Sequence, residues 1–345
     1  MIYHDVTKAG TSRHRSGLMR VSTRLGEALR GEVRAVRWQG GFQDVATGAA
    51  VRFSRADWLL TAELFSEEER PGFSEFIATR PCRLAAIFHD AIPLKLPQVT
   101  WPQSVARHPI YMKLLAGFEL IWAVSEASRQ DLLGYWRWLD VAAVPPVEVL
   151  ALGADFTGAP RQPAKVTAKR ALLCVGILEP RKNQGFLLKV SQALWDEGLD
   201  FELHLAGRVN PHFGRPIARE IAALQRRYRG LQHHAAASDA ALAEIYGQVR
   251  ATVFPTLAEG CGLPLIESLW QGVPCVASDL PALRENAAGG GCALVPVGDA
   301  GAWQTALRRV LTNDEAQAQL AGEAASRLLP TWAAAAAVLR RGLTQ

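Results

Sequence analysis

The segment PTLAEGCGLPLIES, residues 255–268, places two glutamates around a loop that is rich in glycine. Glu259 precedes the loop and Glu267 follows it. Pro264 is typical of the first turn of a helix, because its missing N–H would have no partner there in any case. The sequence therefore predicts a helix that begins at Leu263 or Pro264, directly after glycines that allow close approach to the backbone.

This loop follows an apolar run at 251–256, which reads as a strand. Open α/β sheets bind ligands at the carboxyl ends of their strands, and the amides of a helix start attract anions. Carboxylates accept hydrogen bonds from hydroxyls. The segment thus indicates a ligand that carries both phosphates and sugar hydroxyls. A structural alternative is that acids simply favour first helical turns and glycines make turns. The longer pattern E-G-x-G-L-P-x-x-E, followed by G-x-P-x-V-x-S, favours the ligand site.

Composition indicates a globular chain long enough for two domains. It has 345 residues, of which 49% are apolar and 21% charged. The net charge of +5 permits a weak attraction to anionic lipid or phosphorylated substrates without requiring one. We expect no bilayer-spanning segment and no secretory leader. The cysteines are odd in number and lack C-x-x-C spacing, which predicts free thiols in a reducing cytoplasm: Cys82, Cys174, Cys261, Cys275 and Cys292.

Short apolar runs alternate with longer segments of helical spacing, such as 183–195 and 217–227. This alternation predicts an α/β fold with parallel sheets covered on both faces. The region 34–82 is the least readable, and residues 38–58 within it suggest turns and short strands. The expected strands are 2–6, 84–90, 120–125, 147–152, 171–177, 201–207, 251–256, 274–278 and 292–297.

A domain boundary is expected near 156–169, a window rich in proline, glycine and charge. We therefore expect two Rossmann-like, doubly wound domains, residues 1–157 and 166–328, facing each other across a cleft. The alanine-rich tail at 331–345 predicts a helix. Composition alone favours its packing on the second domain as a surface helix.

The stretch EGCGLPLIESLWQGVPCVAS, residues 259–278, resembles the signature of the retaining nucleotide-sugar glycosyltransferases of family four, whose two-Rossmann architecture is called GT-B. The resemblance covers essentially the whole chain. It implies that residues 1–157 bind the acceptor, that 166–328 bind the donor, and that 329–345 form a helix crossing back to the first domain. Other stretches that carry it are VGILEPRKN (175–183), FHDAIPL (88–94), VSEASRQDLL (124–133) and VEVLALGAD (147–155).

The resemblance implies a role for each residue of the glutamate–glycine segment. Glu267 would hold the ribose hydroxyls of the donor nucleotide, and Glu259 would contact the transferred sugar. Relatives usually have an aromatic residue at the position of Cys261, but a backbone role tolerates the change. A reactive thiol is an alternative, because a helix N-terminus lowers the pKa of a thiol. The amides that would hold the diphosphate belong to Gly260, Cys261, Gly262 and Leu263.

Arg181 and Lys182, in the PRKN turn, are expected to stabilise the negative charge that builds on the leaving diphosphate. Many relatives carry an arginine or a small hydroxyl residue where this chain has Ile177. One phosphate contact is therefore missing here, and we expect Arg181 to provide it. A solvated basic turn is the alternative. The chain has no D-x-D triplet in this context, so the resemblance implies that cations and helix amides replace a metal. No cofactor and no metal are expected.

Further candidates follow from the resemblance. His89, after the apolar run at 84–88, would contact the donor sugar or the acceptor, and counts with Glu259, Lys182 and Arg181 as catalytic. Gly17 would approach the diphosphate, and Arg208 and Ala237 lie where relatives hold the base. An exposed flexible loop is the alternative for residues 13–15. The candidate acceptor-binding residues are Arg13, Arg15, Asp90 and Ser125.

The expected activity is retaining transfer of a sugar, with mannose from GDP-mannose first, to a glycan or lipid-linked oligosaccharide in cell-surface polysaccharide synthesis. Transfer of rhamnose or of a UDP-hexose, sugar-nucleotide epimerisation and non-catalytic carbohydrate binding are the alternatives. A dinucleotide dehydrogenase does not fit, because no G-x-G-x-x-G follows the strand at 2–6. We expect a cytoplasmic protein with no nucleic-acid partner, and a peripheral position at the inner membrane is an option. The donor base, acceptor, linkage, oligomeric state and route to retention stay open.

Overall fold

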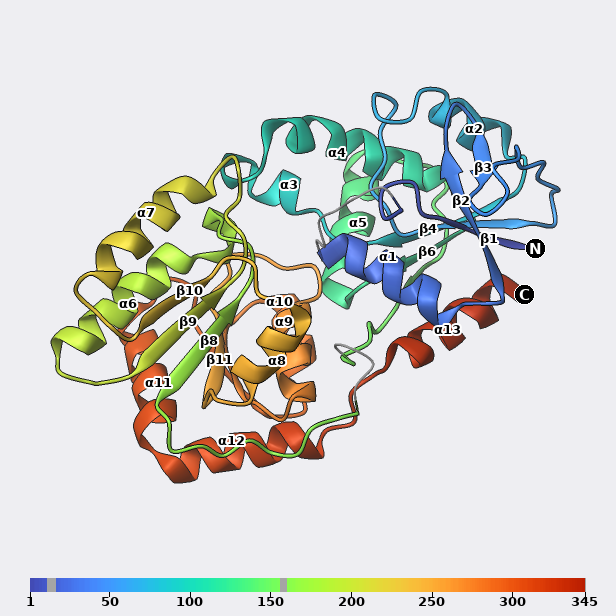
Figure 1. The fold of residues 1–345 in the computed structure, drawn as a ribbon. Helices are drawn as coiled ribbons and strands as arrows, with labels where there is room; N and C mark the ends of the chain where they lie inside the picture. Colours follow the sequence, from blue (N-terminus) through green and yellow to red (C-terminus); the bar gives the residue numbers. More distant parts are fainter. Residues whose placement is uncertain (11–16, 156–159, 345) are drawn as a thin grey trace. The chain divides into compact units, whose positions relative to one another are not determined.

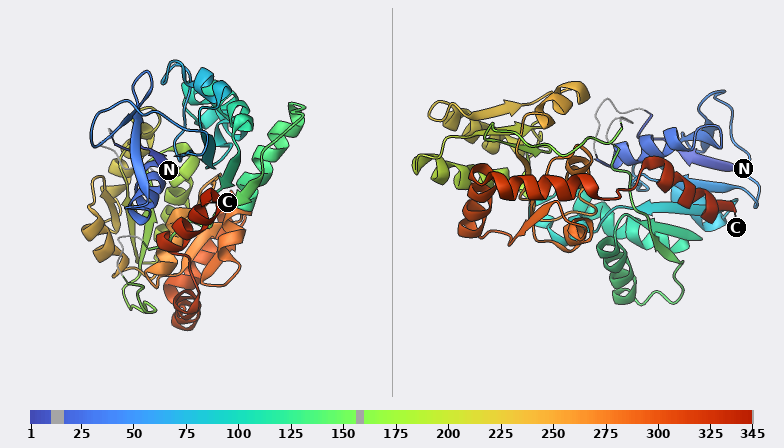
Figure 2. Two further views of the ribbon diagram at one scale, coloured as in Figure 1. Left: turned by 90° about the vertical axis from the view of Figure 1, so that its right-hand side faces the viewer. Right: turned by 90° about the horizontal axis from the view of Figure 1, so that it is seen from below.

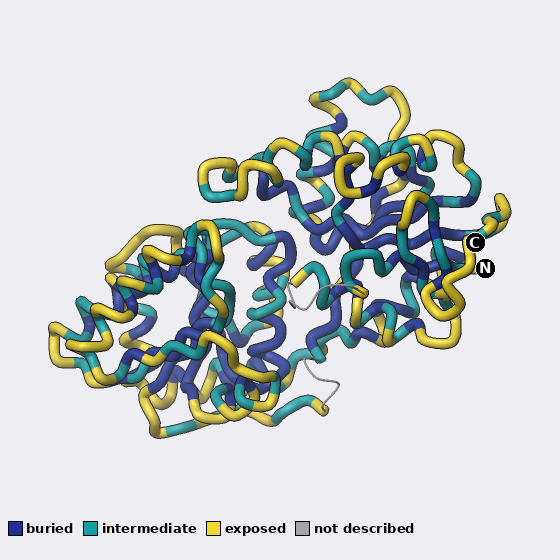
Figure 3. The backbone as a smooth tube through the Cα atoms, turned by 45° about the horizontal axis from the view of Figure 1, so that its top comes forward, coloured by how far each residue is buried: buried dark blue, intermediate teal, exposed yellow. Residues whose placement is uncertain are grey.

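The computed structural model describes residues 1–10, 17–155 and 160–344, and it divides into two compact units (Figure 1). One unit consists of Met1–Gly153 together with Pro330–Gln345, and the other of Ala154–Leu329. Each unit is a sheet with helices on both faces. In Figure 3 the strands are largely dark blue, which marks them as the buried layer of each unit.

The first unit has a seven-stranded sheet of order β3-β2-β1-β4-β5-β6-β7, parallel except for the edge strand β3. Successive strands run outward from β1 in both directions, as in a doubly wound sheet. The strands are β1 (Ile2–Asp5), β2 (Val33–Trp38), β3 (Phe42–Asp44), β4 (Trp58–Thr61), β5 (Arg83–Phe88), β6 (Leu120–Ala123) and β7 (Val147–Val149). The helices are α1 (Gly17–Ala28), α2 (Phe73–Thr79), α3 (Ile92–Lys95), α4 (Pro102–Leu114), α5 (Glu126–Trp138) and α13 (Trp332–Thr344).

The second unit has a six-stranded parallel sheet of order β10-β9-β8-β11-β12-β13. Helices α6, α7 and α11 pack on one face, and α8, α9 and α10 on the other. The strands are β8 (Ala171–Val175), β9 (Glu202–Ala206), β10 (Leu231–His234), β11 (Ala251–Phe254), β12 (Cys275–Ser278) and β13 (Cys292–Val295). The helices are α6 (Gln184–Asp196), α7 (Gly214–Gln225), α8 (Asp239–Tyr246), α9 (Leu263–Trp270), α10 (Pro281–Ala287), α11 (Ala300–Thr312) and α12 (Asp314–Ser326).

The predicted α/β class with two parallel, doubly wound sheets is confirmed, and each of the nine expected strands is present. Four strands among the described residues were not predicted at defined positions. Three of them, β2, β3 and β4, lie within or beside the region 34–82, where the sequence suggests short strands without fixing their bounds. The fourth, β10, has the sequence LQHH, in which only Leu231 is fully buried, so its apolar pattern is weak.

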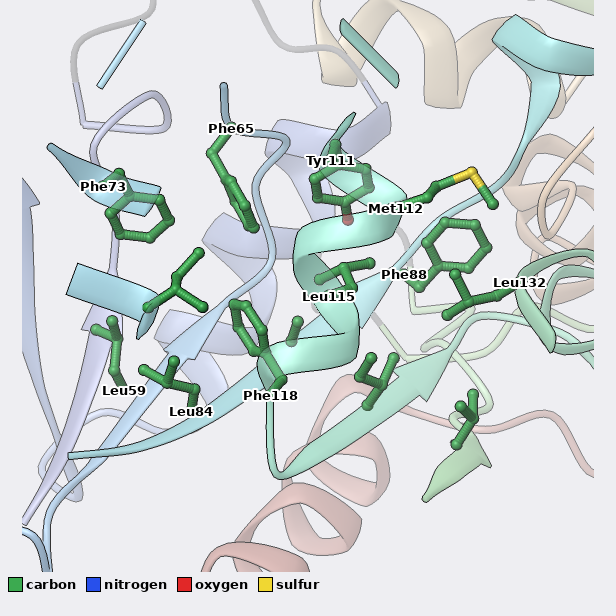
Figure 4. Close-up of a cluster of buried hydrophobic side chains, with 14 of the residues drawn as sticks. Leu59, Phe65, Phe73, Leu84, Phe88, Tyr111, Met112, Leu115, Phe118 and Leu132 are labelled. Atoms are coloured by element: carbon green, nitrogen blue, oxygen red, sulfur yellow. The ribbon is translucent and has the colours of Figure 1, made fainter. Parts of the chain in front are cut away.

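The core of the first unit is an aromatic-rich layer between its sheet and helices α2, α4 and α5 (Figure 4). Phe65 and Tyr111 pack edge to face, with ring centroids 5.0 Å apart. Trp136 of α5 is fully buried, and its indole N–H donates to the carbonyl of Met112 in α4 at 2.7 Å. This layer fixes β5 and the turn after it, which carries His89.

Helix α13 lies beside α1 on the opposite face of the first sheet, as Figures 1 and 2 show. The expectation from composition, that the tail packs on the second domain, is therefore wrong. Gly342 allows α13 to approach Trp122 of β6, because a Cβ there would lie 2.5 Å from the indole Cζ2. The buried side chains of α13 are Trp332, Ala335, Ala336, Leu339 and Leu343.

Two helical glycines provide a matched test of this contact. Gly342→Ala should lower the free energy of unfolding by about 1 kcal/mol or more, because overpacking a full core costs about 1–3 kcal/mol and outweighs the helix propensity of alanine. Gly322→Ala in α12 should be neutral or raise it by up to about 1 kcal/mol, since a Cβ there meets nothing within 4 Å. Denaturation of both variants measures the difference, and equal effects would rule out close packing of α13.

Candidate active site

The loop between β11 and α9 is shaped by Gly262, which caps the helix. Its φ of 86° lies in the left-handed region that favours glycine. A Cβ at this position would lie 2.3 Å from Cδ2 of Leu283, so the backbone conformation and the packing both require glycine. Helix α9 begins at Leu263 with Pro264 in its first turn, which confirms the predicted helix start.

Glu259 lies in this loop with its carboxylate nearly enclosed, the side chain being 9% exposed. Its Oε1 accepts hydrogen bonds from three side chains: Lys182 Nζ at 2.7 Å, Arg181 Nη1 at 3.0 Å and Thr256 Oγ1 at 2.7 Å. Glu267 is buried one turn into α9, at 2% exposure. The structure thus brings Glu259, Lys182 and Arg181 together, although they lie almost eighty residues apart in the chain.

The two cations come from the turn after β8. Residues Pro180–Lys182 form a short 3-10 helix that ends at Asn183 in the left-handed region, with φ 58°. The carbonyl of Arg181 accepts the backbone N–H of Leu257 at 2.8 Å, which ties this turn to the loop after β11. Because β8 and β11 are neighbours at the point where the strand order reverses, the cluster occupies the usual binding position of a doubly wound sheet.

Three residues in this cluster were not singled out from the sequence. Glu179 accepts from Arg181 Nη2 at 2.8 Å, and its other oxygen accepts from Asn210 Nδ2 at 3.0 Å. Thr256 supplies the third donor to Glu259. Glu179 and Thr256 lie within the quoted stretches 175–183 and 255–268, so their place in the motifs was a usable signal. Asn210 comes from the loop after β9, and nothing in its local sequence indicates the contact.

Burial and charge act in opposite directions on the central groups. Burial favours the neutral form of Glu259, but the positive charges of Lys182 and Arg181 outweigh it and hold the pKa of the carboxyl below its ordinary value. Burial lowers the pKa of Lys182, and the carboxylate of Glu259 counteracts that effect. The Lys182 ammonium also lies 4.8 Å from the centroid of the Phe254 ring. The cluster is therefore a buried ion pair with an additional guanidinium.

Cys261 does not behave as an activated thiol. Burial raises its pKa to about 12, so the thiol is protonated at neutral pH. The amide nitrogen of Asn286 donates to the carbonyl of Cys261 at 2.6 Å and anchors the loop to α10. The reactive-thiol alternative therefore does not fit.

Arg208 and Ala237 lie at the same edge of the second sheet as Lys182. Arg208 follows β9, and its carbonyl accepts the N–H of Leu178 at 2.9 Å. Ala237 is exposed in the loop between β10 and α8. Ser238 caps α8, since its hydroxyl accepts the N–H of Ala241 at 3.1 Å.

In the first unit, His89 follows β5 and its turn is held from several directions. His89 Nε2 lies 2.8 Å from the carbonyl of Ala62, and because a carbonyl only accepts, Nε2 carries the proton. Ser128 donates to the carbonyl of His89 at 2.8 Å, and His108 Nε2 donates to the carbonyl of Asp90 at 2.8 Å. Burial lowers the pKa of His89. The ring is thus neutral at pH 7, with Nδ1 as a hydrogen-bond acceptor.

The four acceptor-binding candidates and the donor candidate Gly17 divide into residues at helix starts and residues outside the described part of the chain. Ser125 caps α5 by accepting the N–H of Ser128 at 3.0 Å, and Asp90 Oδ1 accepts the N–H of Ile92 at 2.9 Å. Gly17 is the first residue of α1, and a Cβ there would meet nothing within 4 Å. Arg13 and Arg15 lie outside the described residues.

A buried charge network holds the chain after β1, and no pattern in the sequence indicated it. Arg70, which is 1% exposed, bridges Asp5 and Glu63 with N–O distances of 2.5 Å each. Glu63 also accepts the backbone N–H groups of Lys8 and Ala9, each at 2.8 Å. This network fixes residues 6–10. Two of its members, Glu63 and Arg70, lie in the region 34–82, which had no clear pattern.

Three tryptophans of the first unit differ in exposure. Trp122 and Trp136 are fully buried, whereas Trp138 at the end of α5 is 78% exposed. Among the described residues, no helix combines the length and apolar character that crossing a bilayer requires. The same residues contain no group of three or more His, Cys, Asp or Glu side chains arranged to hold a metal ion.

The second unit matches a known protein family. Residues 169–313 match the family described as "Glycosyl transferases group 1". The chain is 30% identical over 260 residues to the serotype-specific mannosyltransferase WbdA of Escherichia coli, covering 69% of this chain and 31% of WbdA. It is 30% identical over 251 residues to a phosphatidyl-myo-inositol mannosyltransferase of Mycolicibacterium smegmatis, covering 71% of this chain and 60% of that protein. The chain thus spans about a third of the length of WbdA.

Solved structures show the same fold. Sucrose-phosphate synthase from Thermosynechococcus elongatus superposes with a TM-score of 0.74 at 17% identity, over 100% of this chain and 98% of that one. Anabaena HepE, solved with UDP and glucose, gives a TM-score of 0.73 at 12% identity, over 99% of both chains. These structures confirm the predicted GT-B fold class, and the family match at residues 169–313 shows that the second unit resembles a glycosyl transferases group 1 domain.

The lowered pKa of Glu259 predicts a pH-dependent contribution to stability. A carboxylate whose pKa is lowered by folding stabilises the folded state above its ordinary pKa of 4.5, and this contribution is lost as the pH falls through the lowered value. The difference in unfolding free energy between the wild type and Glu259→Gln should therefore be greatest well above pH 4.5 and shrink below it.

Denaturant unfolding at a series of pH values measures this difference. Glu244→Gln removes a carboxylate that is exposed on α8 and serves as the control for the loss of one negative charge. A wild-type minus Glu259→Gln difference that stays constant across the series would contradict the ion-pair assignment.

Proposed function

We propose that this protein is a retaining glycosyltransferase that moves a mannosyl group from GDP-mannose to a hydroxyl of a glycan or lipid-linked oligosaccharide in surface polysaccharide synthesis. The observation that carries the proposal is the cluster of Glu259, Lys182 and Arg181 beside the glycine-capped start of α9. It combines a helix start whose amides attract anions, two cations and two buried carboxylates at one edge of the sheet.

The donor nucleotide would be bound by the α9 side of the cluster. The amides of Gly260 through Leu263 and the positive end of α9 suit a diphosphate. Glu267, buried one turn into the helix, would accept hydrogen bonds from the ribose hydroxyls. Arg208 and Ala237, which follow β9 and β10, would border the base. Cys261 would contribute only its backbone, in agreement with its raised pKa.

The cations would act on the leaving group. A lysine ammonium has three N–H donors, and Glu259 is its recorded hydrogen-bond acceptor in the described part of the chain, so donors remain for a phosphate oxygen. Charge grows on the diphosphate as its bond to the sugar breaks, and a fixed cation is worth most at that moment. Lys182 and Arg181 would thereby supply the positive charge that a divalent metal ion provides in other transferases.

The chemical step needs no protein base. The bond between the anomeric carbon and the diphosphate oxygen breaks, the acceptor oxygen attacks the same face, and the departing phosphate takes the acceptor proton. Glu259 would contact the sugar, and its ion pair keeps it an anion rather than an acid. His89 would accept a hydrogen bond from a sugar hydroxyl through Nδ1, since its Nε2 proton already binds Ala62.

Mannose is the first choice of sugar because the similar curated proteins are mannosyltransferases, two of them from O-antigen systems. The structure of HepE with UDP and glucose supports a UDP-hexose as the second candidate. A peripheral position at the membrane would suit a lipid-linked acceptor. The mycobacterial relative is named for a lipid, as a phosphatidyl-myo-inositol mannosyltransferase.

A thermal-shift panel with GDP-, UDP- and dTDP-sugars tests the donor. At a ligand concentration one hundred times its Kd, the stabilisation is about 2.7 kcal/mol, which raises the melting temperature by a few degrees. We expect GDP-mannose to give the largest shift. A larger shift with a UDP-sugar would select the second candidate, and the absence of a shift with every nucleotide sugar would overturn the proposal.

Lys182→Met should lower kcat by roughly 10²–10³-fold, the range seen when one preorganised oxyanion donor is removed. The measurement is transfer of labelled mannose to a glycan acceptor, followed by mass spectrometry. Lys189→Met makes the same replacement at an exposed position of α6 and should keep full activity. A Lys182→Met enzyme that retains wild-type kcat would exclude the leaving-group role.

A further inference from the structure

Positive charge is concentrated on helix α7 and the turn that follows it. Residues 214–229 contain five arginines and one glutamate, which gives this segment a net charge of +4. Helix α7 packs beside α6 on the second sheet, as Figure 1 shows. Its buried side is formed by Gly214, Ile217 and Ile221.

Three of these arginines form a straight stripe, which we call the arginine stripe: Arg215, Arg219 and Arg226. Their spacing of four and seven residues places them within about 40° around the helix axis and over about 16 Å along it. Arg226 caps the helix with helical backbone angles, φ −69° and ψ −27°, so the geometry continues to the end of the stripe. All three are exposed, and Ala222 lies between them on the same face.

The arginine stripe forms no internal ion pair in the described part of the chain. The ion pairs recorded there include none for Arg215, Arg219 or Arg226, whereas the adjacent Arg227 pairs with Asp196 at 2.7 Å. Arg215 stands in the first helical turn, where the helix dipole disfavours a cation. Ion pairing within the described part of the chain therefore does not account for these arginines, and their position suits contact with an external anion.

The shape of the stripe decides the kind of anion. Guanidinium groups spread over about 16 Å cannot converge on one phosphate, so the partner presents several phosphates on an extended surface. The alanine between the arginines offers nothing that reads a base edge. The nearby ring of Tyr228 is stacked on Trp195 at 4.8 Å rather than left as a platform for bases. These features disfavour a nucleic acid.

We propose that the arginine stripe docks the second unit on a bilayer that contains anionic phospholipids, through guanidinium–phosphate contacts at the headgroup level. Because the exposed face carries no large apolar side chain, the contact is electrostatic, lies on the surface without insertion, and weakens with salt. The binding does not depend on the proposed reaction. Only its purpose, access to a lipid-linked acceptor, rests on the proposed function.

Vesicle co-sedimentation of the full chain without donor or acceptor tests the docking surface. The probes are vesicles of phosphatidylcholine alone and vesicles with a third of phosphatidylglycerol, at low and high salt. We expect binding only to the anionic vesicles at low salt. The triple variant Arg215→Gln, Arg219→Gln and Arg226→Gln should bind roughly fivefold more weakly per arginine, which is on the order of a hundredfold in total.

A second triple variant controls for net charge. Arg52→Gln, Arg55→Gln and Arg309→Gln removes the same charge from exposed positions elsewhere and should bind within a few fold of the wild type. Equal losses in both variants, unchanged binding of the stripe variant, or stronger stripe-dependent binding to DNA than to vesicles would overturn the proposal. Because no nucleotide sugar is present, these outcomes are independent of whether mannose is transferred.

Discussion

A single oxygen atom, Oε1 of Glu259, accepts hydrogen bonds from Lys182, Arg181 and Thr256. The turn after β8 and the loop after β11 therefore share one electrostatic centre. A buried ion needs such partners, because loss of one partner from a buried pair typically costs about 3–5 kcal/mol. The position of the cations, the conformation of the glycine loop and the entry to α9 depend on this contact.

The same arrangement explains why cations are tolerated at a buried position. Lys182 would lose its charge if burial acted alone, and the carboxylate of Glu259 opposes that loss. Glu179 accepts a hydrogen bond from the guanidinium of Arg181 on its other side, and Asn210 holds Glu179 in turn by donating to its second carboxylate oxygen. The site is thus organised before any ligand binds, which is the condition under which fixed charges stabilise a transition state most effectively.

Local patterns predicted much of this structure, and long-range contacts account for the rest. The central strands of both sheets are continuous apolar runs, and the helix start at Leu263 was readable from Gly262 and Pro264. By contrast, β10 ends in two histidines, and Glu63 and Arg70 lie in a segment with no clear period. Asn210 meets Glu179 only because β8 and β9 are adjacent. Such pairings depend on strand order, which residue spacing does not encode.

The membership of α13 in the first unit has a consequence for biosynthesis. Trp122 is fully buried in the folded protein, and Gly342 is one of its close neighbours. While the ribosome adds the second unit, at roughly 5–20 residues per second, the nascent first sheet waits on the order of ten seconds or more for its last covering helix. During that interval the part of the sheet face that α13 later covers, around Trp122, is exposed beside α1, so a chaperone that shields nascent chains has a defined surface to protect.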